Sequence, residues 1–148
     1  DQTPVVQLEY AMGSAIQSFE NPHCVVVPRS RFFPVKTISD WLLLQSDFVT
    51  INPNGMLDYS VNKRPTIALS HPFKTVQDIT QRFDHIPSLK SCESLSVSGD
   101  IQFGNHVSFE GNVELHVPQE HQFRVGSNEI IRNSKLSLSN NELKIIPL

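Results

Sequence analysis

The sequence has few cysteines and no arrangement of cysteine or histidine that is typical of a metal or disulfide framework. Only two of the 148 residues are cysteine, Cys24 and Cys92, and they lie far apart without a C-x-x-C spacing. None of the six histidines belongs to an H-E-x-x-H motif, and His116 and His121 are the nearest pair in the sequence. We therefore expect neither structural zinc nor a disulfide scaffold, and we expect histidines scattered over the surface.

The chain also lacks long apolar runs and a strong excess of one charge. No hydrophobic run approaches the ~20 residues that a bilayer span needs, and no signal-peptide pattern opens the sequence. The net charge of −3 argues against nucleic acid or an anionic membrane as the main partner. No Asn-x-Ser/Thr glycosylation acceptor occurs. These absences predict a cytoplasmic protein without a nucleic-acid or membrane partner.

Glycine is scarce, and its positions exclude the common phosphate-binding loops. The six glycines form neither a G-x-G-x-x-G motif nor a P-loop, so the chain alone is not expected to hold a complete nucleotide site. Acidic residues suited to Mg²⁺ are also few, since only Asp40 and Asp47 lie near the basic segment described next. We expect no metal site in this chain.

A cationic loop at residues 27–40, V-P-R-S-R-F-F-P-V-K-T-I-S-D, is the stretch around which the chain is organised. Its two prolines fix φ and extend the residues before them, which predicts a stiff loop. A stiff cationic loop can hold a phosphate, although loop cations are more often solvated surface residues. The cations are Arg29, Arg31 and Lys36, and the prolines are Pro28 and Pro34.

Short elements are predicted on both sides of this loop. Thr3-Pro4 followed by apolar residues at helical spacing predicts a buried helix of about four turns, and a chain that begins inside such a helix suggests a cut. Val25-Val26-Val27 predicts a buried strand. Ser39, with Asp40, is the expected N-cap of a helix over residues 39–47, and a second helix is expected over 73–83. Residues 52–72 are expected to form a linker with one strand, Thr66 to Leu69.

From Leu95 onward, two apolar columns advance by six residues at a time. Short strands with alternate inward side chains, repeated every six residues, are typical of a parallel β-helix of the hexapeptide kind. Turn residues Gly99, Asn105 and Gly111 keep the same step. Further strands are expected at residues 122–125 and 136–138. The columns are Leu95, Ile101, Val107 and Val113, and Val97, Phe103, Phe109 and Leu115.

Residues 28–40 closely resemble the P-R-S-R-F-L-P-V-K-T-T-S-D segment of the eukaryotic UTP:glucose-1-phosphate uridylyltransferases, also called UDP-glucose pyrophosphorylases. Other matches to that family follow in order along nearly the whole chain. They are Gln7-Leu8-Glu9, residues 11–16 and Phe19-Glu20-Asn21 upstream, and Phe73-Lys74, Arg82-Phe83, Ile86-Pro87, residues 97–100, Phe103-Gly104 and Gly111 downstream.

The resemblance implies the fold and the division of the chain. Residues 1–51 would be the C-terminal segment of an α/β, Rossmann-like nucleotidyltransferase domain, and residues 52–72 a linker. Residues 73–148 would be a C-terminal left-handed parallel β-helix with a capping helix, through which some members of the family self-associate. Apolar residues near the C-terminus suit either a homo-oligomer contact or a core strand ending in Pro147.

The resemblance also implies the chemistry. UTP and glucose 1-phosphate would give UDP-glucose and pyrophosphate, with Mg²⁺ shielding the phosphates and bound outside this chain. Lys36 matches the family lysine that contacts the substrate phosphates. Arg29 and Arg31 are weaker candidates, because they could instead hold the loop through Glu9 or Asp40. The sequence departs from the family segment at two positions. Phe33 stands where the family has leucine and stays apolar. Ile38 stands where the family has threonine, which removes a hydroxyl and puts a phosphate contact by that side chain in doubt.

Because the Gly-rich nucleotide loop of that family is missing, the chain alone is expected to be inactive. The main alternative is a non-catalytic β-helix module for oligomerisation or binding, which would leave the cationic loop without a role. A hexapeptide acyltransferase is a third hypothesis, but it would need more coils and a catalytic histidine, for which His106 and His116 have no obvious partner.

Overall fold

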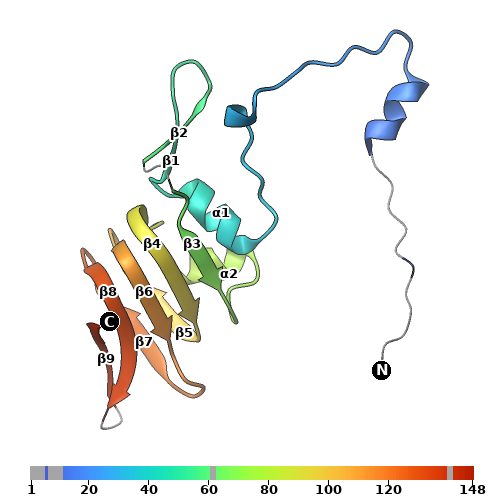
Figure 1. The fold of residues 1–148 in the computed structure, drawn as a ribbon. Coiled ribbons are helices and arrows are strands. Elements are labelled where there is room, and N and C mark those ends of the chain that lie inside the picture. Colours follow the sequence, from blue (N-terminus) through green and yellow to red (C-terminus); the bar gives the residue numbers. More distant parts are fainter. Residues whose placement is uncertain (1–5, 7–11, 61–62, 140–141) are drawn as a thin grey trace.

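The computed structural model describes residues 6, 12–60, 63–139 and 142–148. Residues 12–36 form an extended arm, which leads away from the rest of the chain in its first part and returns to it in its last part, where Phe33 packs against the core (Figure 1). The rest of the chain packs as two helices against β-sheets. The arm contains two short 3-10 helices, Met12–Ser18 and Arg29–Arg31. Among the described residues, no helix is long and apolar enough to cross a membrane.

Two predictions for the arm are wrong where the structure describes it. The expected four-turn helix is a 3-10 helix over Met12–Ser18, while its start at Thr3 lies outside the described residues. Phe19, one of the apolar residues at helical spacing that predict a buried face, is 69% exposed. Val25-Val26-Val27 is exposed and joins no strand within the described chain. A β-branched run forms a strand only where a neighbour supplies backbone partners, and no described segment does so.

Helix α1, Ile38–Gln45, follows the arm and buries Leu42 and Leu43. Its N-cap is Thr37, which corrects the expected Ser39. Thr37 and Asp40 form a reciprocal capping box, in which the Thr37 hydroxyl accepts from the Asp40 amide and the Asp40 carboxylate accepts from the Thr37 amide. A capping box needs a carboxylate three residues after the N-cap, and Asp40 stands at that distance from Thr37 and not from Ser39.

A hairpin and a strand follow in residues 49–69. Strands β1, Val49–Ile51, and β2, Leu57–Tyr59, pair antiparallel, and neither was predicted. The turn between them has Gly55 at φ 72°, a conformation that suits glycine. Strand β3, Thr66–Leu69, is where the sequence predicts it, and it pairs parallel with the next long strand.

Helix α2, Val76–Arg82, confirms the second predicted helix over a narrower range. It begins with the same capping box, formed by Thr75 and Asp78. Ile79 is fully buried, whereas Val76, three residues earlier, is 44% exposed. The Phe83 ring stacks on Phe103 at a centroid distance of 4.3 Å, so the end of α2 closes one end of the β-rich core.

The C-terminal half consists of parallel strands that wind back onto one another. One sheet has the order β3-β4-β6-β8-β9, in which only β9 is antiparallel to its neighbour, and β5 and β7 form a second parallel pair (Figure 1). The bounds are β4 Ser88–Ser98, β5 Asp100–Phe103, β6 Ser108–His116, β7 Gln122–Val125, β8 Ile130–Ser139 and β9 Glu142–Pro147. The α/β class is confirmed.

The two apolar columns line the core of this winding. All eight column residues are at most 1% exposed, which confirms the six-residue step. From Ser94 onward the partners on β4 and β6 are 18 residues apart, as for Ser94 and Asn112, after two register shifts earlier in β4. Between β5 and β7 the partners are 22 residues apart, as for Asp100 and Gln122. Gly99 adopts positive φ at a turn, and at the next turn His106, not Asn105, does so. Gly111 also has positive φ, but it lies inside β6, beside a register shift in the pairing with β4, and not at a turn.

Candidate functional site

The two arginines of the cationic loop form no ion pair with Asp40, one of the two carboxylates expected to hold them. Arg29 and Arg31 are the first and last residues of the short 3-10 helix, and the guanidinium of Arg29 lies 4.8 Å from the centre of the Phe32 ring. Glu9 lies outside the described residues, and Asp40 pairs with Arg64 instead. Both arginines are exposed.

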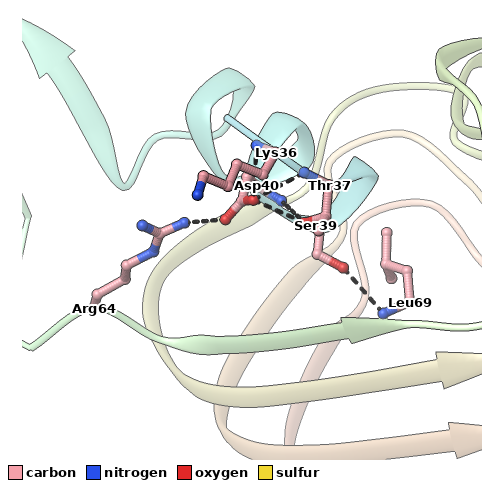
Figure 2. Close-up of polar contacts among 6 residues, drawn as sticks. All are labelled: Lys36, Thr37, Ser39, Asp40, Arg64 and Leu69. Carbon is pink, nitrogen blue, oxygen red and sulfur yellow. Dashed lines mark hydrogen bonds and ion pairs between the residues drawn. The ribbon is translucent and has the colours of Figure 1, made fainter. Parts of the chain in front are cut away.

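Lys36 is held through its backbone by the carboxylate of Asp40. The amides of Lys36 and Thr37 donate to Asp40 Oδ2 at 3.1 and 3.0 Å, and the Thr37 hydroxyl donates to the same oxygen at 2.8 Å (Figure 2). Three donors on one oxygen fix the peptide that joins Lys36 to α1. The loop therefore presents Lys36 from a defined backbone position.

The second oxygen of Asp40 accepts from the Nη2 of Arg64, which forms an ion pair with it (Figure 2). Partial burial raises the pKa of Asp40, but the hydrogen bonds from Thr37 and from the amides of Lys36 and Thr37, together with the charge of Arg64, outweigh it. The pKa of Asp40 consequently lies below its ordinary value. The carboxylate is ionised at neutral pH.

The side chain of Lys36 is exposed, and within the described part of the chain its ammonium forms no ion pair. Beside the loop lies a hollow of about 350 Å³, lined by aromatic rings, Pro34 and two guanidinium groups. Lys36 itself does not line this hollow. An unpaired ammonium on a braced backbone is nevertheless suited to an anionic ligand. The rings belong to Phe32, Phe33, Phe48 and Tyr59, and the guanidinium groups to Arg29 and Arg64.

The acidic residues near Lys36 do not fit a magnesium site. Asp40 is occupied by the contacts above, and Asp47 accepts from the Ser88 hydroxyl and the amides of Leu89 and Lys90. No group of three or more potential metal ligands occurs among residues that the structure describes. No step of the chemistry is assigned to a metal held by these residues.

The histidines are not all scattered. His85 and His106 lie side by side, with ring centres 5.4 Å apart, at a hollow between α1 and the sheet. His116 Nδ1 lies 2.7 Å from the Ser98 hydroxyl. Neither arrangement brings a histidine to the Lys36 loop.

Comparison with known proteins places this loop in a family. The family model described as UTP--glucose-1-phosphate uridylyltransferase matches residues 1–110, which include the whole cationic loop and both helices. The chain belongs to this family. A uridylyltransferase of that name from Pyrus pyrifolia is 40% identical over 140 residues, and one from Saccharomyces cerevisiae is 38% identical over 131. These alignments cover 93% and 87% of the chain but only 30% and 26% of the relatives.

Solved structures of the family share the fold. A UDP-glucose pyrophosphorylase from Leishmania major matches with a TM-score of 0.68 and 30% identity, over 84% of this chain and 27% of that one. A structure from Trypanosoma brucei, described as a UDP-glucose phosphorylase, matches with a TM-score of 0.65 and 36% identity, over 84% and 28%. The chain thus spans less than a third of the uridylyltransferases that it matches.

Sequence reasoning missed Arg64. It lies 24 residues from Asp40, within the predicted linker, and no spacing rule connects the two positions. The Thr37 N-cap can be predicted from the sequence, because T-x-x-D at Thr37 and Asp40 is the spacing of a capping box.

Proposed function

We propose that the whole protein to which this chain belongs is a UTP:glucose-1-phosphate uridylyltransferase. A phosphate oxygen of glucose 1-phosphate attacks the α-phosphorus of UTP, the bond from that phosphorus to the bridging oxygen breaks, and pyrophosphate leaves as UDP-glucose forms. Membership of the family supports this assignment. Transfers of this kind depend mainly on positioning and on charge neutralisation rather than on covalent help from the protein.

Lys36 supplies part of that neutralisation by contacting the substrate phosphates. The observation that carries this role is the braced backbone of Lys36, whose amide is fixed by Asp40 while its ammonium is exposed and unpaired among the described residues. A cation whose backbone is fixed needs little rearrangement to meet developing negative charge. Arg29 and Arg31 add positive potential nearby without a fixed contact of their own to the phosphates.

The chain alone supplies only part of the enzyme. We expect it to lack transferase activity, because its glycines form no nucleotide-binding loop. The division into a segment of the catalytic domain (1–51), a linker (52–72) and a C-terminal domain (73–148) belongs to the same proposal. Magnesium would be bound by residues outside this chain.

The C-terminal domain is proposed to be a left-handed parallel β-helix that mediates self-association. Parallel pairing at 18 and 22 residues and the two inward columns support a coiled winding. Ile145, Ile146 and Leu148 on and after the edge strand β9 are each at least 36% exposed, which supports an apolar contact with a second copy. Sedimentation of the whole protein before and after replacing these three residues with serine tests this contact.

Turnover of the full-length protein tests the role of Lys36. Pyrophosphate release from UTP and glucose 1-phosphate is compared for the wild type, Lys36→Ala and Lys36→Arg, with the fold followed by circular dichroism. We expect Lys36→Ala to lose roughly two orders of magnitude in kcat, the scale of one transition-state donor. Lys36→Arg should retain more activity because it keeps the charge.

Lys135→Ala is the matched control, since Lys135 is an exposed lysine on β8. It should leave kcat unchanged. If Lys36→Ala also turned over normally, the loop would be scaffold, and a non-catalytic oligomerisation or binding module would become the better account of the chain.

A further inference from the structure

We propose that Arg64 is a positioning residue for Lys36: it anchors the loop to the sheet and neutralises the Asp40 carboxylate beside the phosphate-contacting ammonium. This inference rests on the proposed role of Lys36. Neither the cationic-loop sequence nor the family match assigns a part to this arginine, which lies between the hairpin and β3.

Arg64 contacts the loop on both sides of Lys36. Its Nη2 pairs with Asp40 Oδ1, four residues after Lys36, and its guanidinium carbon lies 4.6 Å from the centre of the Phe33 ring, three residues before it. A planar guanidinium can pair with a carboxylate in its plane and stack on an aromatic ring across its face at the same time. One side chain therefore holds both ends of the segment that presents Lys36.

The anchor reaches the core of the protein through β3. Arg64 precedes β3 by two residues, and β3 pairs in parallel with β4, in register from Thr66 and Ser94 onward. At the other end of β3, the Leu69 amide donates to the Ser39 hydroxyl at 3.2 Å (Figure 2). The first turn of α1 is thus fixed at two points, to Arg64 just before β3 and to Leu69 at the end of β3.

Charge gives Arg64 a second effect on Lys36. The Asp40 carboxylate is 22% exposed and lies at the backbone of Lys36, so an unbalanced negative charge there would repel substrate phosphates and attract the Lys36 ammonium. Pairing with Arg64 balances that charge while leaving the other oxygen free to bind the loop amides. Removing Arg64 alone therefore does more harm than removing both partners.

The effect should appear in kinetics more than in stability. Arg64 is 42% exposed, and exposed ion pairs contribute little to the free energy of unfolding. A displaced catalytic cation, in contrast, can lower turnover by about tenfold to a hundredfold. Because Lys36 would be misplaced at the transition state, kcat should fall more than KM rises.

A double-mutant cycle on the full-length protein tests the inference. Steady-state kcat and KM for both substrates are measured for Arg64→Met, Asp40→Asn and the double variant, with thermal melts of each. We expect Arg64→Met to lose about tenfold or more in kcat, and the double variant to recover at least about threefold of that loss because it no longer carries the unbalanced charge. Arg64→Lys should recover only part, since an ammonium restores the charge without the planar stack on Phe33.

Arg132→Met is the matched control. Arg132 on β8 also pairs with a carboxylate, that of Glu110 on β6 at 2.5 Å, and its side chain is likewise exposed. Among the described residues its ion pair is with β6 and not with the loop. It should leave kcat and KM unchanged. Normal kcat in Arg64→Met, or equal loss in Arg64→Met and the double variant, would overturn the inference.

Lys36→Ala, measured in the same series, separates the two proposals. If Lys36→Ala is impaired while Arg64→Met is normal, the positioning role fails and the proposed function stands. If Lys36→Ala is itself normal, the role of Lys36 fails first, and the role of Arg64 fails with it.

Discussion

The Ser88 hydroxyl donates a hydrogen bond of 2.6 Å to Asp47 Oδ2, across 41 residues of chain. The other oxygen of Asp47 accepts from the amides of Leu89 and Lys90 at 2.8 and 3.1 Å. Asp47 follows α1, and the three donors lie at the start of β4. A single carboxylate therefore joins the segment that carries the cationic loop to the first long strand of the sheet.

Replacing Asp47 should destabilise the chain. Asp47→Ala leaves three donors without their acceptor, so we expect the free energy of unfolding to fall by roughly 1–3 kcal/mol in urea denaturation. Ser88→Ala removes only one of the three bonds and should cost less. An equal cost for both variants would mean that the two amide bonds contribute nothing.

Gly99 should not tolerate a side chain. Its φ is 86°, and a Cβ built on it would lie 2.8 Å from the Cβ of Val117, just after β6. We expect Gly99→Ala to lower the free energy of unfolding by roughly 1–3 kcal/mol. Gly13→Ala is the control, because nothing lies within 4 Å of its position, and it should change stability by no more than about 0.5 kcal/mol.

The capping box of α2 should make stability depend on pH in acid. The Thr75 hydroxyl, and the amides of Thr75 and Lys74, donate to Asp78 and lower its pKa below the ordinary 3.8. A carboxyl with a lowered pKa stabilises the fold above its unfolded value, and this contribution disappears as the pH falls through the folded value.

The measurement compares wild type and Asp78→Asn by urea denaturation from pH 6 downward. The difference in unfolding free energy should shrink as the pH falls below 3.8. A constant difference would contradict the capping role of the charged form. Thr75→Ala should cost about 1 kcal/mol at neutral pH, as for other N-cap threonines.

Cys92 should be unreactive in the folded protein. Burial, with a smaller effect of Glu93, raises the pKa of its thiol from 9.0 to about 11. At pH 8, iodoacetamide followed by peptide mass mapping should label exposed Cys24 and leave Cys92 unmodified until urea unfolds the chain. Labelling of both thiols at the same rate would contradict this prediction.

The raised pKa of Cys92 should also make the stability of the fold depend on pH in alkali. Between pH 9 and 11 the unfolded thiol loses its proton while the folded one keeps it, so ionisation favours the unfolded state. Stability should therefore fall over this range, and the fall should be smaller in Cys92→Ala. An identical alkaline profile for the two proteins would show that the thiol does not contribute.

The sequence predicts the six-residue repeat well because each strand and turn of it is specified locally. Alternation along a strand and a six-residue step place all eight column residues in the core, whatever the rest of the chain does. The strands at Thr66–Leu69 and Gln122–Val125 are likewise found as predicted. Short strands without alternation, such as β1 and β2, give no such pattern, and the sequence does not reveal them.

The arm and the brace of the cationic loop depend on contacts between distant residues, which no local sequence pattern encodes. Val25-Val26-Val27 has the composition of a strand, but a strand also needs a neighbour, and no described segment pairs with it. At the site, the cationic loop is visible in the sequence, whereas its brace is not, because Arg64 meets Asp40 only through the path of the chain. Whether Lys36 contacts phosphate remains a prediction for the turnover assay.

Paired residues are 18 apart at the end of β4 and β6 but 22 apart in β5 and β7. This difference indicates where the chain between paired strands can vary in length. Where β4 and β6 pair at a constant 18 residues, from Ser94 to Ser98, an added residue would move the inward side chains to the other face of the strand. The longer turn before β7 lies at residues 117–121, where Glu120 has a φ of 70° and the backbone leaves the ladder. Insertions and deletions among relatives should therefore collect in this turn, while the spacing from Leu95 to Leu115 stays constant.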